Sequence, residues 1–170
     1  MKKKLLGLLL VLLLGLPLVA LSAELVTEGE LQKSGKGIYE VAYTLQTDTS
    51  GDITATTFSD DLVAKVKGKW LMHVEAFPTV GGTAPDAADV VVKDENGIYV
   101  LGSIDGGVTA KNGLSLIHAT IPKACLPAMY LTGTTAFVNY YWPIRGALTF
   151  DILNQGTNTA HITLVFVFTD

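Results

Sequence analysis

The residues best suited to catalysis do not group along this chain. His73, His118 and His161 are isolated in the sequence, so no two of them are presented together as metal ligands. A catalytic histidine also needs several geometric partners, and an ordinary structural role is expected for each. Nothing near Cys125 would activate a thiolate, so we expect a buried, unreactive thiol. Because motifs for a nucleophile elbow, a phosphate loop or a His-Glu-x-x-His site are also missing, we predict no enzyme, catalytic residue or cofactor.

Four carboxylates suggest one metal hypothesis. Asp86, Asp89, Asp94 and Glu95 lie near a clear hairpin signal and could converge with backbone carbonyls on a hard cation such as Ca²⁺. The stretch from Asp94 to Gly97 lacks the full calcium-loop pattern, however. A plain turn is the favoured interpretation, and no metal site is predicted.

A cluster of aromatic residues near the C-terminal third is the best candidate for binding. Tyr140, Tyr141 and Trp142, with Phe137 before them, could form an aromatic interface or a carbohydrate platform, since both use large rigid rings with a polar edge. The alternative is core packing with one exposed ring. We take Tyr140, Tyr141 and Trp142 as candidate interface or ligand contacts.

The N-terminus has the three regions of a secretory signal. Lys2 to Lys4 precede an apolar run from Leu5 to Leu21, and small residues follow at Ser22 and Ala23. A retained membrane anchor is the alternative, although the run falls just short of the ~20 residues that a spanning helix needs. We predict a signal peptide over residues 1–23 and an exported protein, periplasmic, extracellular or on the cell surface. A membrane is a partner only if this segment stays uncleaved.

Charge excludes one class of partner. Removal of the signal takes away three of 12 basic residues and none of the 16 acidic ones, so the formal charge falls from −4 to −7. An acidic surface offers no footprint for nucleic acid, which is bound through Lys and Arg. With a single cysteine there is no intramolecular disulfide, and stability must come from the core.

Period-2 alternation predicts strands through most of the mature chain. Ile38 to Gln46 should bury Tyr39, Val41, Tyr43 and Leu45 on one face. The turn residues 48–52 then suggest a hairpin with a strand at 53–58. Further strands are expected at 69–77, with Trp70, Met72, Val74 and Ala76 on one face, and at 88–93, 97–101, 136–141, 146–153 and 160–168. The Asn96-Gly97 pair between two of them is the strongest hairpin signal.

Other segments are less regular. Residues 24–37 are polar with glycine breaks and predict a flexible N-terminal arm, which could reach a neighbouring subunit. Residues 60–67 fit a short helix capped by Ser59 or an alternating strand. Residues 102–113 are loop-like, 114–121 could be strand or irregular, and 122–135 should cross the surface with one short segment near 128–131. Residues 154–158 fit a tight connection between the last two strands.

About eight short strands and no long helix predict an all-β fold, an antiparallel β-sandwich or jelly roll formed by one domain over residues 38–170. The signal helix would precede it. The last strand, Ile162 to Phe168, is apolar almost throughout. It should be central to a sheet or paired with another chain, because such an edge would aggregate if exposed.

The order of motifs after residue 70 resembles a known group. It runs from an aliphatic strand through Thr83-Ala84-Pro85, the stretch 89–97 (Asp-Val-Val-Val-Lys-Asp-Glu-Asn-Gly), Gly146-Ala147-Leu148-Thr149 and Asn154-Gln155-Gly156 to a closing aliphatic strand. This resembles small β-sandwich proteins of tailed bacteriophages and prophages, called hypothetical or virion structural proteins, over about residues 70–170. The resemblance implies a structural role without catalytic residues. An export signal departs from it, because such components assemble inside the host cell.

Two functions follow as expectations. The first is a non-enzymatic structural or assembly protein of phage or prophage type, present in a virion, that binds copies of itself or other structural proteins through residues 24–37 or the last strand. The second is a secreted or cell-surface binding domain that recognises a glycan or a protein through loops, with Tyr140, Tyr141 and Trp142 as contacts. An assembly protein should bury an apolar sheet edge against identical copies, whereas a monomeric binding domain should keep its edges short or blocked.

Overall fold

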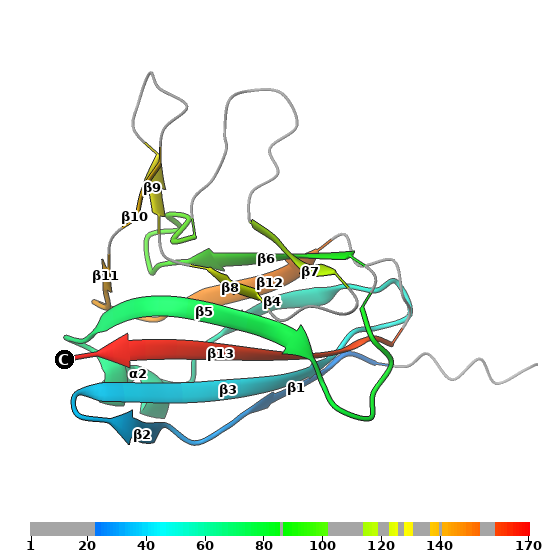
Figure 1. Ribbon diagram of the computed structural model, residues 1–170, viewed down its shortest axis with the longest axis horizontal. Helices are drawn as coiled ribbons and strands as arrows, with labels where there is room; N and C mark the ends of the chain where they lie inside the picture. Colours follow the sequence, from blue (N-terminus) through cyan, green and yellow to red (C-terminus); the bar gives the residue numbers. More distant parts are fainter. Residues whose placement is uncertain are drawn as a thin grey trace, which may run out of the picture.

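Two antiparallel β-sheets packed against each other make up most of the computed structural model (Figure 1). It describes residues 23–85, 87–101, 114–118, 123–125, 128–130, 137–139, 141–153 and 159–170. The predicted all-β class with antiparallel strands is confirmed. The signal segment, Asp86, and residues 102–113 and 154–158 lie outside the described residues.

The larger sheet is built around the C-terminal strand. β13 (His161–Thr169) lies between β3 (Ile38–Gln46) and β5 (Trp70–Pro78) and pairs with both, as Figure 1 shows for the red strand. The last strand is therefore central, which was one of the two positions expected for it. Shorter strands complete the edges, two on β3 and two on β5: β1 (Leu25–Glu28), β2 (Gln32–Gly35), β8 (Lys123–Cys125) and β11 (Trp142–Pro143).

The smaller sheet has the strand order β4-β12-β6-β7. Its members are β4 (Ile53–Thr57), β12 (Thr149–Leu153), β6 (Ala87–Lys93) and β7 (Leu114–His118). A separate two-stranded ribbon consists of β9 (Ala128–Tyr130) and β10 (Phe137–Asn139). β10 falls within the strand predicted at 136–141, and β9 coincides with the short segment expected near 128–131. β7 shows that residues 114–118, for which strand and irregular structure were both open, form a strand, and β8 was not predicted.

The core lies between the sheets and is centred on aromatic rings. Alternate residues of β3 are buried, including Val41, Tyr43 and Leu45 as predicted. The ring of Tyr43 is 4.8 Å from that of Phe150 and 5.7 Å from that of Phe166, measured between centroids. Since β3, β12 and β13 supply these rings, the aromatic cluster joins the two sheets.

The predicted hairpin of β3 and β4 is wrong, because β4 belongs to the other sheet. The turn itself forms, with the Asp48 carboxylate accepting hydrogen bonds from the backbone N–H of Ser50 (2.7 Å) and Asp52 (3.3 Å). Both edges of β3 are already occupied, by β13 and by β1 with β2. The turn therefore carries the chain across to the smaller sheet.

The prediction that residues 24–37 form an arm without a packed element is also wrong. Leu25 to Glu28 and Gln32 to Gly35 pair with β3 as edge strands. The polar composition reflects an edge position, since most of these side chains are exposed. At Gly29 a Cβ would lie 2.8 Å from the carbonyl oxygen of Ala42, so the glycine permits close approach between the two strands.

Residues 60–66 take the helical alternative as α2 (Asp60–Val66). The Ser59 Oγ accepts a hydrogen bond from the backbone N–H of Leu62 (3.2 Å), which caps the first turn. Leu62 and Val66 lie one turn apart and are buried on the same face. Within the described residues, no helix is long and apolar enough to cross a membrane.

A β-bulge changes the faces predicted for β5. Val167 of β13 pairs with His73, and the next residue pairs with Leu71, so Met72 is an extra residue in the ladder. Leu71 therefore shares the buried face with Val74 and Ala76. Strict alternation had placed it with His73, and that prediction is wrong.

Candidate ligand-binding pocket

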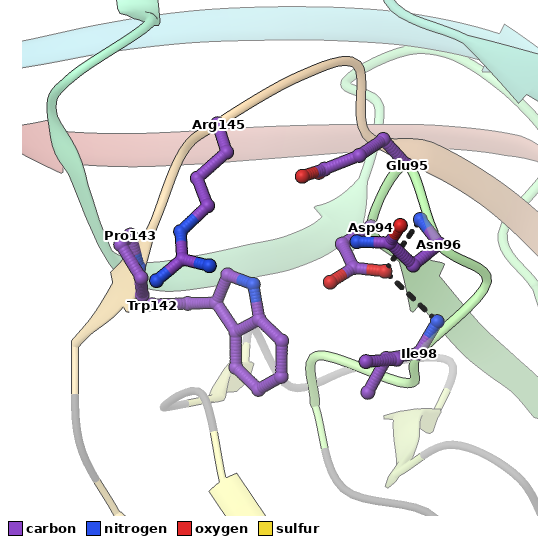
Figure 2. A pocket seen from close by; sticks show the side chains of 7 residues that line it. All are labelled: Asp94, Glu95, Asn96, Ile98, Trp142, Pro143 and Arg145. Carbon is purple, nitrogen blue, oxygen red and sulfur yellow. Dashed lines mark hydrogen bonds between the residues drawn. The ribbon is translucent and has the colours of Figure 1, made fainter.

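A pocket of about 290 Å³ lies between the hairpin turn at residues 94–98 and the segment 142–145, which begins with the last residue of the aromatic cluster. Figure 2 shows the turn residues on one side and the segment 142–145 on the other, with the indole of Trp142 between them. We call it the Trp142 pocket, and its lining residues are Asp94, Glu95, Asn96, Ile98, Trp142, Pro143 and Arg145.

The turn side of the pocket is fixed by Asp94. One oxygen of its carboxylate accepts hydrogen bonds from the backbone N–H of Asn96 and of Ile98, both at 2.9 Å, as drawn in Figure 2. The N–H of Gly97 donates to the Asp94 carbonyl (2.9 Å), and Gly97 has a φ of 77°. This is a three-residue hairpin loop in which the glycine takes the left-handed position. The predicted hairpin turn is confirmed, but the strand predicted at 97–101 is wrong, because this segment contributes a single isolated bridge, between Tyr99 and Lys93.

The other side is held by the larger sheet. Trp142 and Pro143 pair with Leu71 and Trp70 of β5. The N–H of Ile144 then donates to the carbonyl of Lys69 (2.9 Å), and the Ile144 carbonyl accepts from Gly68 (2.9 Å). Because Ile144 is also buried, the backbone immediately before Arg145 is anchored.

The two sides also pack on each other at Gly146. A Cβ at this glycine would lie 2.9 Å from the Cβ and 3.1 Å from the Cγ of Glu95. The absent side chain lets the Glu95 stem lie against the backbone next to Arg145. The walls of the pocket are therefore in contact, which favours a site formed before any ligand arrives.

We expect Gly146→Ala to displace Glu95 and to cost about 1 kcal/mol of folding free energy, at the low end of the usual cost of overpacking. Urea denaturation gives the free energy, and amide chemical shifts of residues 94–98 report the movement of the turn. Gly68→Ala is not a suitable control, since its φ is 88°. Ser34→Ala, at an exposed position of β2, should leave both readouts unchanged.

Three polar side chains of the pocket have no partner among the described residues. Glu95, Asn96 and Arg145 are exposed, and no side-chain hydrogen bond or ion pair within the described ranges involves them. They surround an indole that is 9% exposed. A carboxylate, an amide and a guanidinium around an aromatic ring can together accept and donate hydrogen bonds to a small polar ligand.

The predicted contacts divide between described and undescribed residues. Tyr140 lies outside the described residues. Tyr141 is 48% exposed and can meet a ligand, whereas Trp142 is largely buried and contributes a wall of the pocket rather than an open platform. Sequence reasoning missed Arg145, although a signal was present, because it is the only arginine of the chain.

The carboxylates do not come together as a cation site in the described part of the chain. No group of three or more His, Cys, Asp or Glu residues there could hold a metal ion. Asp89 is buried on β6, Asp94 holds the turn, and Glu95 is exposed. Asp86 lies outside the described residues.

The two histidines whose side chains the structure describes, His73 and His161, do not line the pocket. His73 Nε2 is 3.1 Å from Glu75 Oε1 on the outer side of β5. His161 packs on Gly82, where a Cβ would lie 2.4 Å from the histidine Cβ. The side chain of His118 lies outside the described residues, as does that of Cys125.

A second hollow, of about 450 Å³, lies between the β1–β2 link and α2. Its carboxylate Glu28 accepts hydrogen bonds from the Tyr43 hydroxyl (2.5 Å) and from the hydroxyl (2.5 Å) and backbone N–H (3.1 Å) of Ser59. Burial raises the pKa of Glu28, but these hydrogen bonds outweigh it and hold the pKa below its ordinary value of 4.5. Lys65 pairs with Asp61 beside it. The hollow is larger than the Trp142 pocket, but these polar groups are occupied by structural contacts.

No protein-family model, curated protein or solved structure matches the chain. The resemblance to phage and prophage proteins therefore stays a prediction.

Proposed function

We propose that this chain is a non-enzymatic, exported binding domain that recognises a glycan through the Trp142 pocket and the neighbouring Tyr141. The observation that carries the proposal is that Glu95, Asn96 and Arg145, which lie around the indole, have no side-chain partner among the residues that the structure describes. Sugar hydroxyls need acceptors and donors of this kind, and an aromatic wall suits the apolar face of a sugar ring. Export, to the periplasm, the exterior or the cell surface, rests on the N-terminal signal pattern.

The sheet edges support a binding domain over an assembly protein. The described edge strands are short, and β11 includes Pro143, which cannot donate to a ladder. At β4 the carboxylate of Glu24 accepts a hydrogen bond from the backbone N–H of Thr54 (2.7 Å), which blocks one edge group. The two surfaces expected to join copies, residues 24–37 and β13, are already paired within the chain.

We also propose that the two sheets form a jelly-roll-like sandwich. Two packed antiparallel sheets with crossing connections are typical of jelly-roll-like sandwiches, which include lectin domains as well as capsid proteins. The fold is compatible with both functions, which differ in the oligomeric state that they require. Light scattering after size-exclusion chromatography should give a monomer mass at every concentration. A defined ring or larger assembly would instead favour the phage-type structural protein.

A sugar array probed with the purified domain tests the binding function. We expect binding to selected glycans, and about a tenfold loss of affinity in Glu95→Gln, since a charge-assisted hydrogen bond contributes about 1.5–3 kcal/mol. Tyr141→Ala should also lower the affinity, because it removes the exposed aromatic ring next to the pocket. Glu30→Gln and Leu25→Ala change an exposed carboxylate and an exposed apolar side chain away from the pocket and should bind as the unaltered domain does. Equal binding by all four variants would place the site elsewhere.

A further inference from the structure

The chain uses arginine once, in the Trp142 pocket. Of its 12 basic residues 11 are lysines, and Arg145 is the exception. Lysine suffices for solubility and for general surface charge, whereas the planar guanidinium provides a fixed fork of donors that matches a carboxylate, sulfate or phosphate. The position of the arginine is therefore informative about the ligand.

Lysines near the hollows are engaged within the chain, in contrast to Arg145. Lys65 pairs with Asp61, and Lys69 pairs with Asp170. Lys93 lies 3.5 Å from the carboxylate of Asp151 and 5.2 Å from the ring centroid of Tyr99. Within the described residues Arg145 makes no ion pair, although Asp94 and Glu95 line the same pocket. No ion pair in the described part of the chain therefore competes with a ligand for its guanidinium.

The pocket has opposite polarity on its two sides. Figure 2 shows Arg145 beside Pro143 on one side of the indole, and Asp94, Glu95 and Asn96 on the other. A ligand with an anionic group at one end and hydroxyls at the other satisfies both sides. A ligand with many negative charges does not fit this pocket, because Glu95 and a domain of formal charge −7 would repel it.

We propose that the Trp142 pocket binds one acidic sugar unit, whose single carboxylate or sulfate pairs with Arg145 while its hydroxyls bond to Glu95 and Asn96. This inference rests on the proposed glycan-binding function and names its ligand class. A volume of about 290 Å³ lies at the small end of ligand sites, so the pocket takes a single ring and leaves the rest of a chain to outer contacts such as Tyr141.

Chemical-shift titration of the ¹⁵N-labelled domain provides the test. The probes are sodium glucuronate, glucose 6-sulfate and glucose, each added in the millimolar range at matched ionic strength. We expect the Trp142 indole N–H and the Arg145 Nε–H signals to shift with an acidic probe, and glucose to bind at least tenfold more weakly. The variant Trp70→Phe assigns the two indole signals. A response to glucuronate alone would show that the pocket selects a carboxylate, and a response to glucose 6-sulfate alone would show that it selects a sulfate.

The variants separate this inference from the proposed function. Arg145→Gln should lose at least tenfold in affinity for the acidic probe and respond to all three probes alike, whereas Lys36→Gln, at an exposed turn, should match the unaltered domain. Equal binding of glucose and the acidic probes, unchanged in Arg145→Gln, would overturn the acidic-sugar assignment and leave glycan binding standing. No response to the three probes together with no binding on the sugar array would overturn both.

Discussion

Phe166→Ala should remove about 3–5 kcal/mol from the free energy of unfolding, the usual cost of truncating a fully buried phenylalanine. Phe166 is 0% exposed and lies opposite Val41 of β3 and Val74 of β5. Its ring centroid is 5.0 Å from that of Phe58 and 5.7 Å from that of Phe150. Loss of the ring leaves a cavity at the point where both sheets and the segment before α2 meet.

Urea denaturation measures this effect, and Val165→Ala is the matched control. Val165 precedes Phe166 on β13 but faces the outer side of the sheet, where it is only partly buried. We expect the control to lose about 1 kcal/mol. If Phe166→Ala does not fold, Phe166→Leu, which keeps most of the apolar area, supplies an intermediate value. A loss no larger than that of the control would contradict the central position of Phe166 in the core.

The strands could be predicted where the hydrophobic pattern has a single explanation. Residues 38–46 alternate without interruption, and β3 has those bounds. The apolar run near the C-terminus can be stable only inside a sheet, and β13 lies there. Asn96-Gly97 predicted its hairpin because few residues tolerate the left-handed conformation of Gly97.

The strand partners could not be predicted, because pairing depends on which edges remain free. β3 and β4 are adjacent in sequence and joined by a good turn, yet the long β13 competes successfully for the edge of β3. The segment 24–37 places only Val26 and Leu31 against the core, so its backbone pairing with β3 leaves no regular alternation in the sequence. The Met72 bulge likewise has no marker such as a glycine in the sequence.

The candidate site could be predicted only in part, because it also depends on strand pairing. The aromatic stretch and the turn residues were each recognised, but as separate features. The aromatic stretch and the turn come together because β11 pairs with β5 and because Gly146 lies against Glu95. Arg145 stands out in the sequence as the single arginine, but its neighbours in the pocket are known only from the structure.

Glu28→Gln should cost about 1.5–3 kcal/mol at neutral pH, the range for hydrogen bonds to a charged group. The carboxylate joins three elements, because it belongs to β1 and accepts from Tyr43 of β3 and from Ser59, the cap of α2. An amide at this position has one acceptor oxygen and no charge. The buried Tyr43 hydroxyl, whose pKa is raised by burial and by its bond to Glu28, would lose its strongest partner.

The cost of Glu28→Gln should depend on pH in a defined direction. The pKa of Glu28 is lowered in the folded protein, so its contribution is fully present above the ordinary value of 4.5 and is lost as the pH falls through the folded value. The difference between the two proteins should therefore stay constant from pH 7 to about 5 and shrink below about 4.5. Urea denaturation at pH 7.0 and 3.5 measures it, with Glu30→Gln as the exposed control.

A double-mutant cycle then assigns the interaction to its partners. If Tyr43 and Glu28 stabilise each other directly, Tyr43→Phe and Glu28→Gln together should cost at least 0.5 kcal/mol less than the sum of the two single changes, the lower bound for residues in contact. Additive costs would mean that the carboxylate does not stabilise Tyr43 directly. A Glu28→Gln difference that does not change with pH would mean that the charge of Glu28 contributes nothing to stability. The edge strand β1 would then be held by its backbone ladder with β3 alone.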